Sequence, residues 1–234
     1  ENLADQVAET QADAAVAEAM NPDTTHSDAA EAETSALFAA LGPATSSEIV
    51  FIDSRVEDYE TLIAGIDRGA EVVLLDTESD GIAQIANTLE GRQGLTAIHI
   101  VSHGEAGELL LGDSVFNQDS MDGRHADALQ SISSALSAEA DVLIYGCNFG
   151  EGETGLSAMQ ASADATGADV AASDDLTGAA ELGGDWQLEA TVGVIENGVI
   201  VNAEAMAAFN GVLTSTLDWS DYTADPQFPP TLDG

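Results

Sequence analysis

Lysine is absent from this 234-residue sequence, and its four basic residues are all arginines, against 43 Asp and Glu residues. The formal net charge is therefore −39. Nucleic-acid binding requires cations that neutralise phosphates, and anionic membranes recruit polybasic segments, so neither is an expected partner. Carboxylate oxygens are the ligands that calcium prefers, and salt relieves their mutual repulsion. The composition is typical of a protein in a salty extracellular setting.

Cysteine occurs once, at Cys147, which excludes an internal disulfide framework. A lone cysteine is either a small buried residue or a reactive thiol. The chain also lacks any run of about 18 apolar residues, so no membrane insertion is expected. Hydrophobic residues nevertheless make up 44% of the sequence, which is enough to build a core.

Composition divides the chain into three regions. Residues 1–47 are acidic and rich in alanine, which predicts either weakly amphipathic helices or a tether. Residues 48–213 contain compact apolar runs and form the expected folded domain. Residues 214–234 contain three of the five prolines and are expected to be a linker to a following domain.

Within residues 48–213, short apolar runs alternate with segments of helical periodicity. This alternation is typical of an α/β fold, in which a mainly parallel sheet is covered by helices on both faces. The predicted strands are EIVFID (48–53), EVVLLD (71–76), TAIHIVS (96–102), DVLIYG (141–146) and ADVAAS (168–173).

Two further segments favour β-hairpins. GELLLGDSVFN (107–117) predicts a small hairpin that turns at Gly112-Asp113. WQLEATVGVIENGVI (186–200) alternates in hydropathy and predicts C-terminal β-hairpin elements with Asn197-Gly198 at the turn. A short helix is expected over Ala203–Phe209.

A candidate catalytic pair follows two of the predicted strands. His103-Gly104 comes after the strand at 96–102, and Gly146-Cys147 ends the strand at 141–146. If these strands are neighbours, the two side chains meet at the carboxyl edge of the sheet, where open α/β folds bind ligands. A thiol needs a base before it can attack a carbonyl, and imidazole supplies one. The backbone N–H groups of Gly104 and Cys147 are the candidate oxyanion hole.

His-Gly after one strand and Gly-Cys after the next resemble the caspase-like cysteine peptidases of clan CD. The segments FIDSRVEDY, IHIVSHG, LIYGCN and AASDDLTG…LGGDWQLE are similar to a bacterial family called domain of unknown function 4347. That family lies near the start of very large secreted repeat proteins and adhesins. The resemblance covers about residues 48–213 and implies a caspase-like three-layer sandwich.

The resemblance also implies an activity and a location. The expected function is a self-processing cysteine endopeptidase within a secreted or cell-surface protein, whose substrate is a polypeptide such as its own parent chain. The alternative is a catalytically inactive caspase-like module that anchors, caps or contacts other domains of an adhesin. In that case Cys147 is an unreactive core residue.

Specificity in that clan depends on a pocket for the residue before the cut bond. Asp174 and Asp175 follow the strand at 168–173 and would select Arg or Lys in such a pocket. Arg55 follows the first strand and would select an acidic residue instead. Asp53, at the end of that strand, is a candidate for orienting substrate. These residues favour opposite specificities, and the sequence leaves both open.

Metal sites are weakly indicated. DTESDG (76–81) resembles the start of a calcium loop, but Asn87 stands where such loops place a glutamate. No cofactor is therefore required, and calcium is the one metal that the sequence favours at all.

The histidines do not form a zinc site. His99 and His103 are about 13 Å apart along a strand, too far to share a metal ion. His99 is expected in the core, whereas His26 and His125 have polar neighbours and are expected to be solvated.

Overall fold

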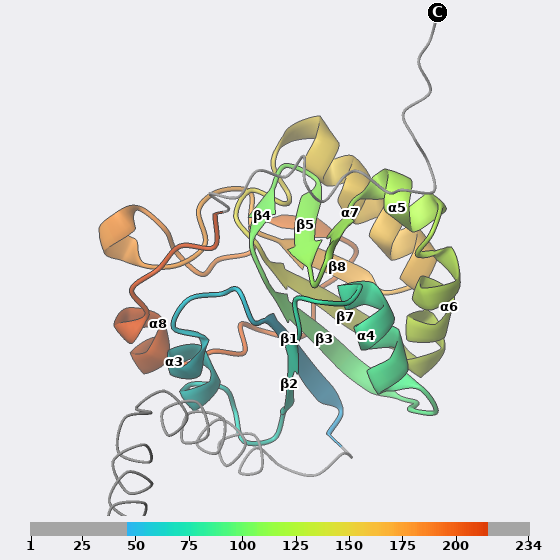
Figure 1. The fold of residues 1–234 in the computed structure, drawn as a ribbon, viewed down its shortest axis with the longest axis horizontal. Coiled ribbons are helices and arrows are strands. Elements are labelled where there is room, and N and C mark those ends of the chain that lie inside the picture. Colours follow the sequence, from blue (N-terminus) through green and yellow to red (C-terminus); the bar gives the residue numbers. More distant parts are fainter. Residues whose placement is uncertain (1–45, 215–234) are drawn as a thin grey trace, which may run out of the picture. The chain divides into compact units, whose positions relative to one another are not determined.

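The computed structural model describes residues 46–214 (Figure 1). The helices or tether expected before residue 46, with His26, and the linker expected after residue 214 lie outside the described residues. The prediction of an α/β fold with a mainly parallel sheet is confirmed.

The central sheet has six strands in the order β2-β1-β3-β7-β8-β9. The first five strands are parallel, and β9 pairs antiparallel with β8 at one edge. All five predicted parallel strands are confirmed, although β7 begins earlier than the sequence predicts. Their bounds are β1 Glu48–Asp53, β2 Glu71–Leu75, β3 Leu95–Val101, β7 Leu136–Tyr145, β8 Asp169–Ala172 and β9 Ala190–Val192.

Helices cover both faces of this sheet, which makes three layers (Figure 1). On one face α3 (Tyr59–Ala64) packs against α8 (Ala203–Ala208). The other face carries four helices, which are α4 (Gly81–Leu89), α5 (Gln118–Asp122), α6 (Ala126–Ala135) and α7 (Gly152–Thr166). Because both faces are buried, the strands are apolar throughout. Phe51, Ile100 and Ile144, for example, pack in one core with Ile85 and Leu129.

A small antiparallel sheet lies beyond the carboxyl end of β3. It consists of β4 (Gly104–Glu105), β5 (Glu108–Leu111) and β6 (Ser114–Phe116). The predicted hairpin at Gly112-Asp113 is confirmed, and Gly112 has a φ of 60°. A side chain there is excluded, since its Cβ would lie 2.0 Å from the Ser79 carbonyl oxygen.

The hairpin predicted over residues 186–200 is wrong. One strand, β9, forms in this segment, followed by irregular backbone. The backbone N–H groups of Glu196 and Asn197 donate to Oδ2 of the buried Asp141, as does the Asn197 side chain. The Asn197 amide also donates to the Thr96 carbonyl. These side-chain hydrogen bonds replace the strand pairing that the alternation suggested.

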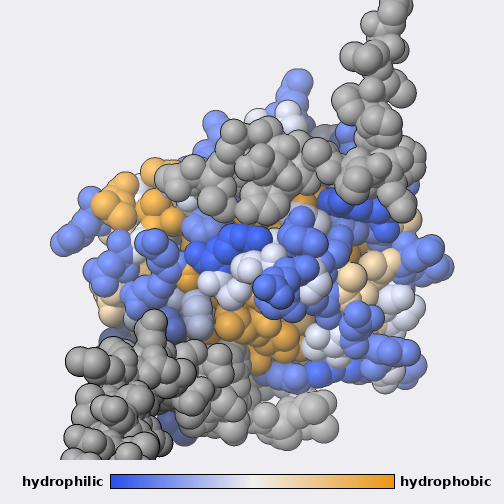
Figure 2. All heavy atoms as spheres, in the orientation of Figure 1, coloured by the Kyte–Doolittle hydropathy of each residue, from blue (hydrophilic) through white to orange (hydrophobic). Residues whose placement is uncertain are grey.

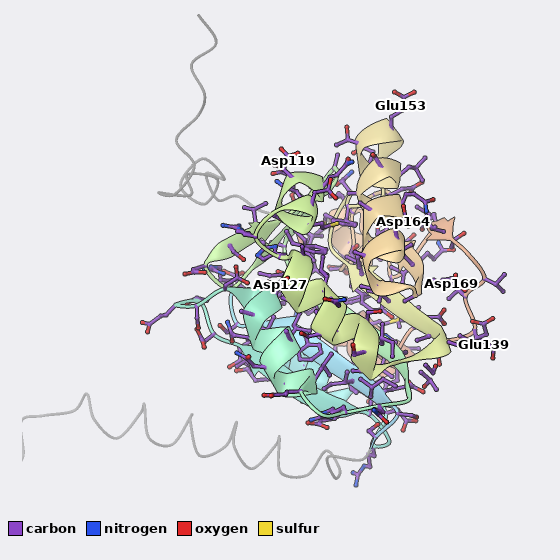
Figure 3. All side chains as sticks on the ribbon, turned by 90° about the vertical axis from the view of Figure 1, so that its right-hand side faces the viewer. Asp119, Asp127, Glu139, Glu153, Asp164 and Asp169 are labelled. Carbon is purple, nitrogen blue, oxygen red and sulfur yellow. The ribbon has the colours of Figure 1, made fainter. Side chains whose placement is uncertain are left out.

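The acidic residues lie largely on the outside. Figure 3 shows acidic side chains projecting from α5, α6, α7, β7 and β8, and hydrophilic residues cover much of the face in Figure 2. The labelled ones are Asp119, Asp127, Glu139, Glu153, Asp164 and Asp169. Among residues 46–214, the helices are all too short or too polar to span a bilayer.

We predict that Asp141→Ala lowers the free energy of unfolding by about 2–4 kcal/mol, because it leaves three N–H donors around residue 197 without their acceptor. Urea denaturation measures the loss. Asp164→Ala, at an exposed position on α7, is the matched control and should change stability by less than about 0.5 kcal/mol. Equal effects of the two substitutions would contradict this role of Asp141.

Candidate active site

Parallel pairing of β3 with β7 brings the two candidate catalytic residues together. Val101 is in register with Tyr145, and Ser102 N–H donates to the Tyr145 carbonyl at 3.2 Å. His103 and Cys147 each follow two residues after this register pair. The expectation that the two strands are neighbours is confirmed.

The glycines allow the two loops to approach closely. A Cβ on Gly104 would lie 3.0 Å from the Cys147 carbonyl oxygen and 3.1 Å from the Gly146 Cα. After Cys147 the chain turns sharply, with Asn148 at a φ of 61°. The turn places Cys147 on a bend between β7 and α7, where its backbone N–H is not part of a strand or helix.

The ring of His103 is oriented by a backbone carbonyl. Its Nε2 lies 3.2 Å from the Arg55 carbonyl oxygen. Because a carbonyl can only accept, Nε2 carries the proton, and in the neutral ring Nδ1 has the lone pair. Nδ1 is buried and has no hydrogen-bond partner among residues 46–214. His103 is therefore held in the tautomer of a base whose accepting nitrogen is unengaged.

The thiol of Cys147 is fully buried. Its Sγ accepts from Thr177 N–H at 3.2 Å, and the thiol donates to the Thr177 carbonyl oxygen at 3.6 Å. Burial raises the pKa of the Cys147 thiol, which backbone N–H groups of Thr177 and Leu213 partly oppose, and the charge of Asp175 raises it further. At neutral pH the thiol is protonated, so nucleophilic attack requires a base.

One donor of the expected oxyanion hole already binds a peptide carbonyl. Gly104 N–H donates to the Leu213 carbonyl oxygen at 3.0 Å. The segment from Gly211 to Thr214 thus lies over the edge where His103 and Cys147 meet.

Asp53 and Arg55 belong to the turn after β1 that orients His103. Asp53 is fully buried and accepts from the N–H groups of Arg55 (2.9 Å) and Gly112 (2.7 Å), with its carboxylate 3.3 Å from the Arg55 guanidinium. Burial raises the pKa of Asp53, while these N–H groups and the charge of Arg55 oppose the rise. Asp53 fixes the turn that presents the Arg55 carbonyl to His103. We therefore correct its expected role from contact with substrate to positioning.

A pocket of about 580 Å³ adjoins His103. It is lined by Arg55, Glu57, His103, Leu182 and residues 209–214. Asp174 and Asp175 are exposed at the end of β8 and do not line this pocket. Of the residues expected to bind substrate, the structure places Arg55 beside His103.

A second, larger pocket of about 720 Å³ shares Leu182, Phe209 and Asn210 with the first. It contains neither His103 nor Cys147, and its wall includes Trp186. Trp186 is mostly buried and packs edge-on against Phe209, with ring centroids 5.5 Å apart.

The other described histidines are both buried. His99 is in the core as predicted, with Nδ1 3.2 Å from the Tyr145 hydroxyl. The prediction that His125 is solvated is wrong, because its Nε2 lies 2.8 Å from Oδ2 of Asp80. Although burial acts to raise the pKa of Asp80, the hydrogen bonds from His125 and the Ala83 N–H together with the charge of Arg124 outweigh it, and the pKa is about 2. No signal near His125 in the sequence indicates this distant partner.

The calcium loop suggested by DTESDG has its carboxylates engaged elsewhere. Asp76 accepts from Ser79 Oγ and Glu78 N–H, and Asp80 accepts from Ala83 N–H at the start of α4. Among the described residues, two other groups have carboxylates close enough to share an ion. These are Asp141, Asp169 and Glu196, and Asp174, Asp175 and Glu189.

Comparison with known proteins gives one match. The family model described as "Domain of unknown function (DUF4347)" matches residues 49–213. No curated protein and no solved structure matches the chain.

We predict that His99 makes stability depend on pH. Burial lowers the pKa of His99 to about 4, although the charge of Asp141 opposes the shift. In the unfolded chain the pKa is about 6.5, so between pH 7 and pH 5 the unfolded state binds more protons, and acidification favours unfolding. This residue should cost the folded state about 2 kcal/mol over that range.

Urea denaturation at pH 7, 6 and 5 checks this expectation. His99→Phe should remove about that part of the pH dependence, whatever its effect on stability at pH 7. The same slope of unfolding free energy against pH in both proteins would contradict the assignment.

Proposed function

The chain belongs to the DUF4347 family, and we propose that in this member the domain is a cysteine endopeptidase of the caspase-like type. Cys147 is the nucleophile, and His103 is the general base and later the general acid. The N–H groups of Gly104 and Cys147 stabilise the oxyanion.

The orientation of the His103 ring carries this proposal. Nε2 is fixed on the Arg55 carbonyl, and Nδ1, which then holds the lone pair, is buried without a partner next to the loop that carries Cys147. In the proposed reaction Nδ1 takes the proton of the Cys147 thiol. The Arg55 carbonyl then stabilises the imidazolium through Nε2–H, as the orienting member of a catalytic triad does.

The setting supports a peptide as substrate. Gly104 N–H donates to a peptide carbonyl, and the pocket beside His103 is bounded largely by residues 209–214 of the chain itself. The net charge of −39 disfavours nucleic acids as partners. We place the domain in a large secreted or cell-surface protein, where it processes its own parent chain without a required cofactor. Calcium, if bound, would act on stability.

One observation favours the alternative of a catalytically inactive module that anchors, caps or contacts other domains of a surface protein. Cys147 is fully buried and its thiol pKa is raised, as for a core cysteine. That alternative predicts a Cys147 that reacts with no peptide electrophile.

The test uses the full chain and a peptide chloromethyl ketone ending in Val-Leu, with adducts located by mass spectrometry. We expect one adduct on Cys147 and none in Cys147→Ala. His103→Gln should slow labelling by about 100-fold or more, because the thiol then lacks its base. Iodoacetamide carries no peptide that could displace residues 211–214 from the site. It should therefore label Cys147 of the native chain far more slowly than Cys147 of the chain unfolded in urea.

Asp164→Ala is the matched control and should label like the wild type. Labelling that is unchanged in His103→Gln, or no adduct under any native condition, would overturn the proposal in favour of the inactive module.

A further inference from the structure

The segment after α8 crosses the candidate active site and forms isolated β-bridges on its way. In Figure 1 it runs from α8 to β4. Ala179 N–H donates to the Gly211 carbonyl at 2.8 Å, and Leu213 N–H donates to the Thr177 carbonyl at 2.9 Å. These bonds pair the segment antiparallel with residues 177–179.

The opposite edge of the same segment pairs with the small sheet. Gly104 N–H donates to the Leu213 carbonyl, and Gly104 and Thr214 form a parallel bridge. Residues 211–214 are thus held on both sides by main-chain hydrogen bonds. Such bonds recognise a polypeptide whatever its side chains, as in binding by strand addition.

This pairing links Leu213 to the backbone around both proposed catalytic residues. The Leu213 N–H donates to the carbonyl of Thr177, whose own N–H donates to the Cys147 sulfur, and the Leu213 carbonyl oxygen accepts from the Gly104 N–H. The Leu213 carbonyl is therefore the peptide carbonyl that occupies the proposed oxyanion donor, in a segment paired with the Thr177 backbone that contacts Cys147. The bond that follows this carbonyl joins Leu213 to Thr214.

We propose that the Leu213–Thr214 peptide bond is the bond that this domain cleaves in its own chain, and that an apolar residue is required before the cut. This inference rests on the proposed function. It replaces the two charged specificities considered from the sequence. Asp174 and Asp175 lie outside the pocket beside His103, and the Arg55 guanidinium is bonded to Asp53 and the Thr77 carbonyl. The Leu213 side chain, by contrast, is fully buried.

The reaction balances with water as the one co-reactant. His103 takes the thiol proton, Cys147 Sγ bonds to the Leu213 carbonyl carbon, and the C–N bond breaks as the Thr214 nitrogen receives that proton. Water then gives a proton to His103 and adds to the thioester, and the C–S bond breaks. The products are a carboxylate at Leu213 and an amine at Thr214, and the proton returns to Sγ.

The experiment follows the purified chain by intact mass and sequences any new amino terminus. We expect fragments that end at Leu213 and begin at Thr214 in the wild type and in Asp164→Ala, and none in Cys147→Ala. Leu213→Asp should slow the cut by at least 100-fold. Because that change buries a charge and risks misfolding, Thr214→Pro is the second variant.

Thr214→Pro keeps Leu213 and turns the scissile bond into a tertiary amide, whose ring constrains the leaving nitrogen that His103 must protonate. It should fold with an unchanged melting temperature and should not be cut. Cleavage at another bond that depends on Cys147, or adducts on Cys147 without any cut at Leu213–Thr214, would overturn this inference and leave the peptidase proposal standing. Neither adduct nor cut would overturn both.

Discussion

The parallel pairing of β3 with β7 is the constraint on which the site depends. Val101 is in register with Tyr145. His103 and Cys147, each two residues further along, therefore leave the sheet at the same edge and at the same height. Burial of both faces of these central strands fixes that register, since a slip by one residue would turn His99 and its neighbours to the opposite face. The close approach of Gly104 to Gly146 and Cys147 follows from the same pairing.

The Asp53 carboxylate and the Arg55 carbonyl then orient His103 for the reaction. Asp53, held by the N–H groups of Arg55 and Gly112, fixes the turn after β1. That turn offers the Arg55 carbonyl to His103, which selects the tautomer of the ring. The thiol of Cys147 stays neutral because burial raises its pKa, so the reactive thiolate exists only when His103 has taken the proton. The segment at 211–214 pairs with Gly104 and with residues 177–179 and is itself the proposed substrate.

The strands were predictable because each is a compact apolar run between polar turns, as EIVFID and EVVLLD are. The β5–β6 hairpin and α8 were predictable from the turn at Gly112-Asp113 and the apolar spacing after Asn202. The strand ends also place His103 and Cys147 at the same edge of the sheet, whereas their proximity depends on the pairing of β3 with β7 that the structure supplies.

What failed depended on contacts between distant segments. The hairpin around Asn197 gave way to hydrogen bonds with Asp141, 56 residues earlier in the chain. His125 is buried because Asp80 lies beside it. The role of Arg55 uses its backbone carbonyl, which every residue type possesses, so no sequence signal marks it. The segment at 211–214 is likewise held by main-chain hydrogen bonds to Gly104 and to residues 177–179, and its amino-acid sequence does not indicate these partners.

The tautomer of His103 tests this account most directly. Two-bond ¹H–¹⁵N NMR at pH 7.5 distinguishes a protonated Nε2 from a protonated Nδ1, and the His103→Gln spectrum assigns the signals. We expect the proton on Nε2 and a bare Nδ1, as the hydrogen bond to the Arg55 carbonyl requires. A proton on Nδ1 would mean that the ring has no lone pair available for the thiol of Cys147, and it would contradict the proposed base.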